Sequence, residues 1–325
     1  MSLNKPNIAI LGLGGIARKM AYTVNKTDFA ALYAAASRSI DKAEAFAKDF
    51  GAKKAYGSYE EMVSDSKVDL VYIATPHAFH AEYALMCLEH GKHVLVEKPL
   101  AVNKAQAERV FGLAERKGLF AGEAMWSRFQ PIQKTLNEII NSGRIGEVTQ
   151  VTAFMGGAMT HVPRLAEPGL AGGALLDVGI YPLNFASMII DEDIARIDGN
   201  AVLSDKGVDL KNGFVLTYKS GKMAVLGSSM VSEMDARGVV YGTKGRIEAE
   251  LIFDILRLNV IGEGGSEVIE RPEEITGFEY ELEAAVRAIG EGKTEFEEMR
   301  HSETIKMLGI MDKLREQWGV RYPFE

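Results

Sequence analysis

The chain has 325 residues, of which 47% are hydrophobic and 25% are charged. This composition is typical of folded globular proteins and excludes disorder as the main state, while the length predicts about two domains. The 37 Lys and Arg residues are outnumbered by 45 Asp and Glu residues and are scattered along the chain. The net charge of −8 therefore argues against nucleic acid and anionic membranes as partners.

Three sequence features predict a cytoplasmic protein without a membrane segment. The most apolar window, residues 171–190, is interrupted by Asp177, Tyr181 and Asn184, so it does not have the pattern of a spanning helix. A strand-like run begins at Asn7 and leaves no room for a signal peptide. Because Cys87 is the single cysteine, no intramolecular disulfide can form, and we interpret it as a packing residue in a reducing compartment.

Residues 1–123 alternate between two kinds of pattern. Short apolar runs predict strands at residues 7–11, 29–36, 68–74, 93–96 and 119–121. Apolar residues at helical spacing predict helices at residues 15–25, 41–50, 58–63, 79–90 and 103–117, and Ser58 with Glu61 has the spacing of a capping box. Strands that alternate with helices form βαβ units, so we expect the α/β class, with a doubly wound parallel sheet over residues 1–123.

After residue 124 the alternation stops, which predicts a second domain over residues 124–325. A helical pattern at 126–141 precedes strand patterns at 148–155, 194–203, 213–218, 223–230, 237–241, 246–250 and 255–260. Turn signals at 219–221 and 243–245 separate several of them, so we expect a large, mostly antiparallel open sheet. Further helices are predicted at 172–189, 277–289 and 302–317, and residues 262–266 are interpreted as a loop.

The first predicted strand is followed directly by a glycine-rich turn. Residues 12–17, Gly-Leu-Gly-Gly-Ile-Ala, fit the pattern G-x-G-x-x-G/A of dinucleotide-binding βα turns. Gly12 permits the tight turn, Gly14 lets the backbone approach a pyrophosphate, and small Ala17 lets helix and strand pack closely. Gly15 and Ile16 complete the expected contacts with the cofactor. The alternative is a glycine-rich turn that binds no ligand.

The end of the second predicted strand indicates which dinucleotide is bound. NAD sites place Asp or Glu there to accept a hydrogen bond from the ribose 2′-hydroxyl, whereas this chain has Ser37 and Arg38. A guanidinium suits a 2′-phosphate, and Lys42 offers a second cation. We therefore expect NADP rather than NAD. Solvated surface charge is the alternative for both cations.

Two more segments follow predicted parallel strands, at the edge where such sheets bind ligands. The first is Ala74-Thr75-Pro76-His77 with His80 three residues further on, and the second is Glu97-Lys98-Pro99. We expect the histidines to hydrogen-bond near the cofactor, and no metal site, since no Cys or carboxylate accompanies them. Lys98 is expected to point into the ligand crevice, with surface charge as the alternative.

Together with residues 172–182, GGALLDVGIYP, these motifs resemble the Gfo/Idh/MocA oxidoreductase family over essentially the whole chain. Residues 54–61, 123–129 and 160–164 resemble the branch that contains dimeric dihydrodiol dehydrogenase and NADP-dependent D-xylose dehydrogenase. The resemblance implies an NADP-binding Rossmann domain and a substrate-binding and oligomerisation domain. It also implies that Lys98 and Tyr181 are the catalytic pair. Much of the family has His where this chain has Tyr181 and Asp where it has Asn184, and this departure favours the named branch.

The chemistry of an alcohol dehydrogenase agrees with those roles. The hydroxyl proton must be removed while a hydride leaves carbon, and tyrosine is a poor base at its reference pKa near 10. An ammonium within about 4–6 Å stabilises the phenolate, which Lys98 would supply. Asp177, one helical turn earlier, would hold substrate hydroxyls or orient the pair, unless it only stabilises a helix N-terminus.

Other residues are candidates for the wall of the site. Trp126, Arg128 and Phe154 would line the pocket, with Trp126 and Arg128 also touching the cofactor, and His161 and Arg164 would lie on a substrate loop. A core position for Trp126 and a surface position for His161 are the alternatives.

We therefore expect an NADP-dependent oxidoreductase that acts on a sugar, a polyol or a trans-dihydrodiol. One alternative is a sugar oxidoreductase whose cofactor stays bound and is recycled, and another is a non-catalytic dinucleotide-dependent regulator, against which the presence of both Lys98 and Tyr181 argues. The helices after residue 124 are too few to cover both faces of the sheet, so we expect a homodimer, or a dimer of dimers. The strand with Met223, Val225 and Met230 suits such a contact.

Overall fold

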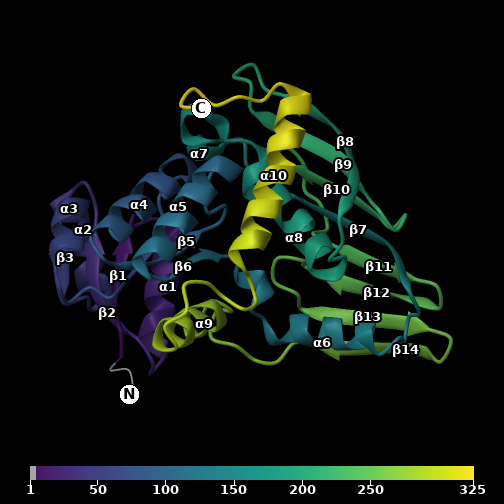
Figure 1. Ribbon diagram of the computed structural model, residues 1–325, viewed down its shortest axis with the longest axis horizontal. Helices are drawn as coiled ribbons and strands as arrows, with labels where there is room; N and C mark the ends of the chain where they lie inside the picture. Colours follow the sequence, from purple (N-terminus) through teal and green to yellow (C-terminus); the bar gives the residue numbers. More distant parts are fainter. Residues whose placement is uncertain (1–4) are drawn as a thin grey trace. The chain divides into compact units, whose positions relative to one another are not determined.

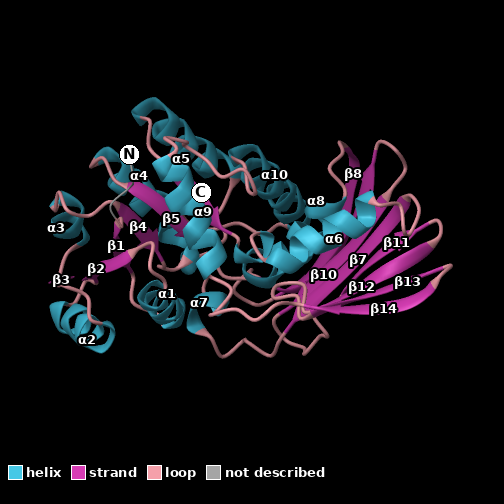
Figure 2. Cartoon of the chain, turned by 90° about the horizontal axis from the view of Figure 1, so that it is seen from below, coloured by secondary structure: helices cyan, strands magenta, loops and turns pink. Residues whose placement is uncertain are grey.

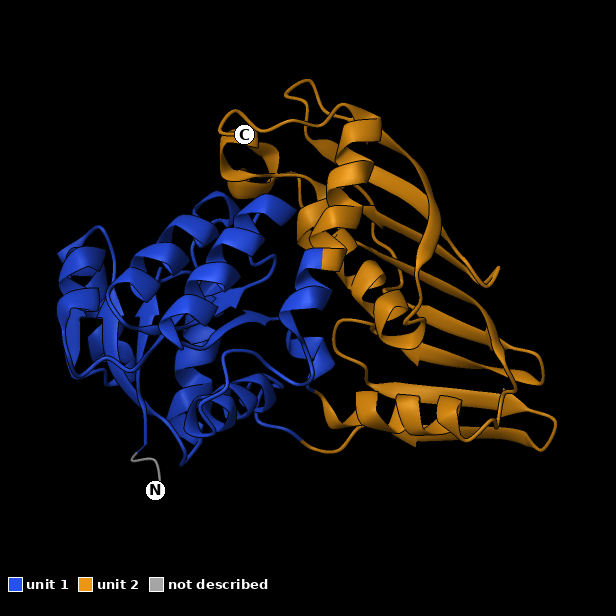
Figure 3. Cartoon of the chain, in the orientation of Figure 1, with its two compact units in different colours: residues 1–129, 274–305 blue, residues 130–273, 306–325 orange. Residues whose placement is uncertain are grey.

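The computed structural model describes residues 5–325 (Figure 1). The chain separates into two compact units, coloured separately in Figure 3. Unit 1 combines the chain up to Phe129 with Glu274–Ile305, and unit 2 combines Gln130–Glu273 with Lys306–Glu325. The chain therefore passes from one unit to the other three times. The functional domain limits expected above, 1–123 and 124–325, stay a prediction.

Unit 1 contains the predicted doubly wound parallel sheet. Its strands lie in the order β3-β2-β1-β4-β5-β6 and all pair in parallel. The order reverses between β1 and β4, which is where ligands bind in such sheets. The strands are β1 (Asn7–Leu11), β2 (Ala31–Ala36), β3 (Lys54–Tyr56), β4 (Leu70–Ile73), β5 (His93–Glu97) and β6 (Ala121–Ala124).

The helices of unit 1 follow the helical spacing of the sequence. They are α1 (Gly15–Lys26), α2 (Ile40–Phe50), α3 (Tyr59–Ser64), α4 (His80–Glu89), α5 (Lys104–Lys117) and α9 (Glu279–Gly290). The Ser58 hydroxyl oxygen accepts a hydrogen bond from the Glu61 amide at 3.3 Å, as the predicted cap requires, and donates its own hydrogen to Glu60. Gly51 and Gly118 end α2 and α5 in the left-handed conformation that glycine adopts without strain.

Unit 2 contains an eight-stranded sheet in the order β14-β13-β12-β11-β7-β10-β9-β8. Only β7 and β10 pair in parallel, so the expected mostly antiparallel sheet is confirmed. The strands are β7 (Val148–Gly156), β8 (Ile194–Leu203), β9 (Asp209–Tyr218), β10 (Met223–Ser229), β11 (Gly238–Gly242), β12 (Gly245–Glu250), β13 (Arg257–Gly262) and β14 (Gly265–Glu270). Its helices are α6 (Pro131–Asn141), α7 (Pro163–Ala166), α8 (Ile180–Ile189) and most of α10 (His301–Trp318).

Three local predictions were wrong in detail. The loop expected at 262–266 is a tight turn between paired Gly262 and Gly265, and it leads into the exposed strand β14. The helix expected at 126–141 is a 3₁₀ turn, Trp126–Arg128, followed by a separate α6 that begins at Pro131, because proline favours the first turn of a helix. The helix expected at 172–189 begins with a π-helical turn, Leu175–Gly179, before α8.

The two faces of the large sheet, seen in Figure 2, differ in their cover. On one face, a Cβ on Gly238 would lie 2.5 Å from the Phe185 ring of α8, and a Cβ on Gly199 would lie 3.0 Å from Leu314 of α10. Side chains alternate along strands, so the neighbouring residues point to the other face. There, large apolar side chains are 37–50% exposed: Phe154, Val202, Met223 and Tyr241. This face is uncovered, and no helix within residues 5–325 is long and apolar enough to cross a membrane.

Candidate functional site

The glycine-rich turn after β1 is shaped by close backbone contact. Gly12 has φ +88°, and a Cβ there would lie 2.9 Å from both the Ala74 carbonyl oxygen and Thr75 Cγ2. Around Gly14 and Gly15, no atom lies within 4 Å of the place a Cβ would take, whereas Ala17 is fully buried against the sheet. The first turn of α1 therefore presents open backbone N–H groups, which is the arrangement that binds a pyrophosphate.

Thr75 supplies a second observation at the same edge. Its hydroxyl is buried and has no hydrogen-bond partner within residues 5–325. A buried hydroxyl without a partner costs free energy, so a partner from outside the chain would stabilise it. Together with the close backbone contact at Gly12 and the open N–H groups of α1, this hydroxyl fits a bound dinucleotide.

The residues that follow β2 keep their charges exposed. The Ser37 amide donates to the Tyr56 carbonyl at 3.1 Å, which fixes the strand end. Arg38 and Lys42 are exposed, and within the described chain neither makes a hydrogen bond or an ion pair. Burial raises the pKa of Tyr59 and of Tyr83, and the nearby Arg38 charge opposes both shifts. Two unpaired cations at this place are able to receive an anion.

His80 links the two loops that follow β4 and β5. It is fully buried, with Nδ1 2.8 Å from the Pro99 carbonyl oxygen and Nε2 2.7 Å from the Thr75 carbonyl oxygen. Burial lowers its pKa to about 4, so the ring is neutral at pH 7 and donates one of these contacts. The His77 ring lies edge-on at 5.7 Å. Because both nitrogens of His80 face carbonyl oxygens, it is a structural link, and no metal-binding cluster occurs among residues 5–325.

Lys98 directly follows β5, and two buried carboxylates, Glu97 and Glu123, hold the backbone around it. Tyr72 donates to Oε1 of Glu97, and the Lys98 amide donates to Oε2 of Glu97 at 3.2 Å. Glu123 of β6 accepts from the Leu100 amide at 2.9 Å and from Thr304 at 2.7 Å. Burial raises the pKa of Glu123. These bonds fix the backbone on both sides of Lys98, and Glu123 was missed because nothing in its sequence pattern distinguishes it from a surface acid.

Trp126 and Arg128 hold unit 1 together. The Trp126 ring packs against Phe278 with ring centroids 4.9 Å apart, and Lys19 Nζ lies 4.1 Å from its centroid. Nη2 of Arg128 lies 3.2 Å from a Glu303 oxygen, and its side chain is 7% exposed. Both residues therefore have structural partners. Contact with a cofactor or a substrate stays a prediction for them.

Glu281 of α9 is a buried acid that the sequence did not reveal. It is fully buried, and neither carboxylate oxygen has a hydrogen-bond partner in the part of the chain that is described. Burial raises its pKa well above the ordinary value, the Glu97 charge adds to this, and Lys19 opposes it. Burial therefore favours the protonated form of this side chain.

In unit 2 the structure pairs Arg164 with Asp177, and Tyr181 follows Asp177 by four residues. Asp177 is 6% exposed and accepts from the two Arg164 Nη atoms at 2.9 and 3.4 Å. Tyr181 begins the next turn, is 8% exposed, and packs edge-on against Phe253 with ring centroids 5.9 Å apart. Arg164 itself keeps 43% of its side chain exposed. The structure thus shows an ion pair at Asp177, four residues before Tyr181 in the chain.

Two of the predicted residues do not join this group. His161 is exposed on the loop before α7. Phe154 lies on the uncovered face of the sheet, whereas a Cβ on Gly179 would lie 2.7 Å from Ser228 on the opposite face. Phe154 and Ser228 therefore lie on opposite faces of the sheet, and a place for Phe154 in the wall of a pocket stays a prediction. Because side chains alternate along a strand, the sequence predicts that Phe154 and its chain neighbours face opposite sides of the sheet. It does not predict which side is covered.

The stretch before Asp177 depends on two glycines and a buried acid. A Cβ on Gly172 would lie 2.4 Å from the Leu165 carbonyl oxygen, and a Cβ on Gly173 would lie 2.2 Å from Oδ1 of Asp209. Oδ2 of the fully buried Asp209 accepts from the Leu175 amide at 2.8 Å. Burial raises the pKa of Asp209 to about 7, although its hydrogen bonds from Asn212 and Leu175 oppose the shift. Asp209 therefore fixes the start of the π-helical turn.

Known families match both parts of the chain. Residues 6–124 match the family described as "Oxidoreductase family, NAD-binding Rossmann fold", and residues 133–248 match the "GFO/IDH/MocA C-terminal domain". The trans-1,2-dihydrobenzene-1,2-diol dehydrogenase of Xenopus tropicalis is 33% identical over 300 residues, which cover 89% of this chain and 90% of that protein. The enzyme of the same name from Mus musculus is 34% identical over 301 residues, which cover 89% of each protein.

Solved structures share the fold over nearly the whole chain. A 3-ketoreductase from Actinomadura kijaniata, in complex with NADP and TDP-benzene, superposes with a TM-score of 0.89 at 25% identity, covering 96% of this chain and 98% of that chain. An aldose-aldose oxidoreductase from Caulobacter crescentus, complexed with glycerol, has a TM-score of 0.87 at 24% identity and covers 96% of this chain and 97% of that chain.

The raised pKa of Asp209 predicts a pH-dependent stability. Between the unfolded value of 3.8 and the folded value of about 7, the folded chain keeps a proton that the unfolded chain releases. The free energy of unfolding should therefore fall as pH rises through this interval, by about 1.4 kcal/mol per unit from this group. Urea unfolding of the wild type and of Asp209→Asn at pH 5 and pH 7 measures the difference.

Asp198→Asn is the matched control, because the Asp198 side chain is 48% exposed. It should leave the pH dependence of stability unchanged. An Asp209→Asn variant with the same pH slope as the wild type would contradict the prediction.

Proposed function

The chain belongs to the Gfo/Idh/MocA oxidoreductase family and is an NAD(P)-dependent dehydrogenase acting on CH–OH groups, and from this premise we propose that it uses NADP and a small polyhydroxylated substrate. The substrate would be a sugar, a polyol or a trans-dihydrodiol. Support comes from the relatives at 33–34% identity, whose name specifies a trans-dihydrodiol. The single cysteine, Cys87, which is buried and free, supports a cytoplasmic location.

The unpaired, exposed Arg38 at the end of β2 is the observation that carries the choice of NADP. Its guanidinium would hold the 2′-phosphate with Ser37 and Lys42, where an acidic side chain would repel it. The orphaned Thr75 hydroxyl supports a bound cofactor at the adjoining turn. The residues proposed to surround the rest of the dinucleotide are Gly12, Gly14, Gly15, Ile16, Ala17, Ala74, Thr75, Pro76, His77, His80, Glu97, Lys98, Trp126 and Arg128.

Arg38→Ala should weaken NADP binding and leave NAD binding unchanged. Losing a charge-assisted contact to phosphate costs about 1.5–3 kcal/mol, or about tenfold to a hundredfold in affinity. Titration of both variants with each cofactor measures this. Lys48→Ala, an exposed cation further along α2, is the control, and equal NADP affinity of Arg38→Ala and wild type would overturn the assignment.

We assign the proton transfer to Tyr181 and its support to Lys98. When bound, the nicotinamide supplies the hydride acceptor or donor. The Tyr181 phenolate takes the substrate hydroxyl proton in oxidation, and the resulting phenol returns it in reduction, so one residue serves both directions. The Lys98 ammonium stabilises the phenolate form. Asp177, held by Arg164, accepts hydrogen bonds from neighbouring hydroxyls of the substrate, and His161 is the next candidate on the substrate loop.

Tyr181→Phe should lower turnover by about a hundredfold to ten-thousandfold, the usual contribution of general acid–base transfer, with NADP affinity nearly unchanged. Lys98→Met should also lower turnover and should move the basic limb of activity to higher pH, because the phenolate loses its cation. Steady-state turnover against pH and NADPH fluorescence measure both effects. Tyr241→Phe, on the uncovered sheet face, is the control; near-normal turnover of Tyr181→Phe would assign the proton transfer elsewhere.

A screen of NADP reduction over aldoses, polyols, inositols and trans-dihydrodiols tests the proposed function. We expect turnover with at least one class, and the NAD reaction should be slower. Cofactor that remains bound through extensive dialysis, with turnover only when two sugars are present, would favour the sugar oxidoreductase that recycles its cofactor. Cofactor binding without turnover of any class would favour a regulator.

The uncovered sheet face supports a homodimer formed by a second copy of this chain. Phe154, Val202 and Met223 expose apolar surface there. A hollow of about 480 Å³ is lined by residues that include Val202, Asn200 and Lys211. Burying such a face against a second copy removes apolar area from water. Light scattering should give a multiple of the 35.5 kDa chain mass. Val202→Asp should reduce the measured mass, whereas Tyr22→Asp in unit 1, the control, should not. A monomer at micromolar concentration would contradict the proposal.

A further inference from the structure

Gly172 is the junction between the loop that carries Arg164 and the stretch that carries Asp177 and Tyr181. Its amide donates to the Glu167 carbonyl oxygen at 3.1 Å, and the next amide, that of Gly173, donates to the Leu165 carbonyl oxygen at 2.9 Å. The backbone on both sides of this junction is therefore fixed. The direction of the Gly172 carbonyl sets where the π-helical turn begins.

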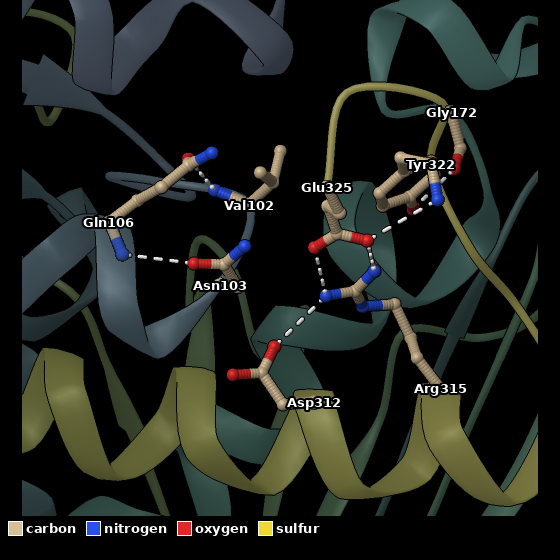
Figure 4. Close-up of polar contacts among 8 residues, drawn as sticks. All are labelled: Val102, Asn103, Gln106, Gly172, Asp312, Arg315, Tyr322 and Glu325. Atoms are coloured by element: carbon tan, nitrogen blue, oxygen red, sulfur yellow. Dashed lines mark hydrogen bonds and ion pairs between the residues drawn. The ribbon is translucent and has the colours of Figure 1, made fainter.

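That carbonyl is held by a residue from far along the chain. The Tyr322 hydroxyl donates to the Gly172 carbonyl oxygen at 2.8 Å, and Tyr322 is 3% exposed (Figure 4). Burial raises the pKa of Tyr322, so the hydroxyl keeps its proton and remains a donor. No part of the loop or of the π-helical turn supplies this bond.

Tyr322 is itself anchored by a partly buried ion pair. Arg315 of α10 has a side chain that is 6% exposed, and its Nη atoms lie 2.8 and 2.9 Å from the two carboxylate oxygens of Glu325. A third contact runs from Arg315 to Asp312 at 3.0 Å, and the guanidinium lies 4.8 Å from the Tyr322 ring centroid. This paired geometry folds residues 319–325 back onto α10 (Figure 4). Removing the Glu325 carboxylate would leave the buried Arg315 guanidinium without its paired partner, which is destabilising.

Two hydrogen bonds, one from Tyr322 and one to Asp209, hold the two ends of the short stretch 172–175. Tyr322 holds the Gly172 carbonyl, and Asp209 holds the Leu175 amide at 2.8 Å. Asp177 lies two residues after Leu175, inside the π-helical turn, and Tyr181 follows in α8. A π-helical turn has weaker internal bonding than an α-helix and often occurs at functional sites, so its position depends on outside contacts.

We propose that Tyr322, anchored by Arg315 and Glu325, is a positioning residue that fixes Asp177 and Tyr181 for catalysis through the Gly172 carbonyl. The proposal rests on the function assigned to Tyr181 above. It adds a part of the chain, residues 319–325, that no cofactor or substrate is expected to touch. A misplacement of the proton-transferring group by about 1 Å is enough to slow such a reaction.

Tyr322→Phe tests the proposal, because it removes only the hydroxyl and keeps the packed ring. We expect kcat to fall about fivefold, the effect of losing one neutral hydrogen bond, with NADP affinity and cofactor KM unchanged. Backbone amide exchange over residues 172–179 should become faster by a similar factor in the free protein. Glu325→Gln should produce the same pattern by loosening the anchor, and Arg315→Lys should do so as well, because lysine keeps the charge but loses the two-point contact with the carboxylate.

Tyr33→Phe is the matched control, because the Tyr33 hydroxyl donates to Asp65 in unit 1 and Tyr33 is 6% exposed. It should lower stability without changing exchange over 172–179. Wild-type kcat and exchange in Tyr322→Phe, beside an impaired Tyr181→Phe, would overturn the positioning role. If Tyr181→Phe is itself fully active, the assignment of Tyr181 fails, and exchange over 172–179 decides the structural claim: faster exchange supports it and unchanged exchange overturns it.

Discussion

The turns that follow β1 and β4 lie so close together that residue 12 has no room for a side chain, and the edge of unit 1 depends on this approach. A Cβ on Gly12 would lie 2.9 Å from the Ala74 carbonyl oxygen. His80 then connects the second turn to Pro99, the residue after Lys98. Because the carboxyl ends of parallel strands meet at one edge, a shift at Gly12 would propagate to the lysine. The glycine-rich turn after β1 is therefore shaped mainly by backbone contacts. The charged side chains around it add selectivity between dinucleotides.

Most strands and helices could be predicted because their apolar residues repeat at the period of the element. The exceptions have a physical reason. β3 (Lys54–Tyr56) has three residues and only partial burial, and β14 (Gly265–Glu270) is an exposed edge strand, so neither shows an apolar pattern. Helix α9 was predicted, but periodicity gives the apolar face of a helix and not the body it packs against. The return of residues 274–305 to unit 1 was therefore not visible in the sequence.

For the candidate site, the sequence predicted which residues follow the ends of strands and form turns. It could do this only where a motif has a fixed spacing. It did not indicate pairings between distant residues. Arg164 was proposed for a substrate loop, but its ion pair with Asp177 comes from packing. Asp209, Glu281 and Tyr322 were missed, since burial changes a side chain's chemistry and burial of a single acid or phenol leaves no periodic signal.

The discontinuity of unit 1 has a consequence for how the protein is made. Its first segment packs aromatic groups against residues that are synthesised much later: Phe111 stacks on His301 with ring centroids 3.8 Å apart, and Trp126 packs on Phe278. All of residues 130–273 must leave the ribosome first. At about 5–20 residues per second, this takes roughly 7–30 seconds, during which the emerging chain exposes part of its apolar core. The nucleotide-binding unit is thus the first to begin folding and cannot be the first to finish, which makes nascent chains of this protein candidates for chaperone binding.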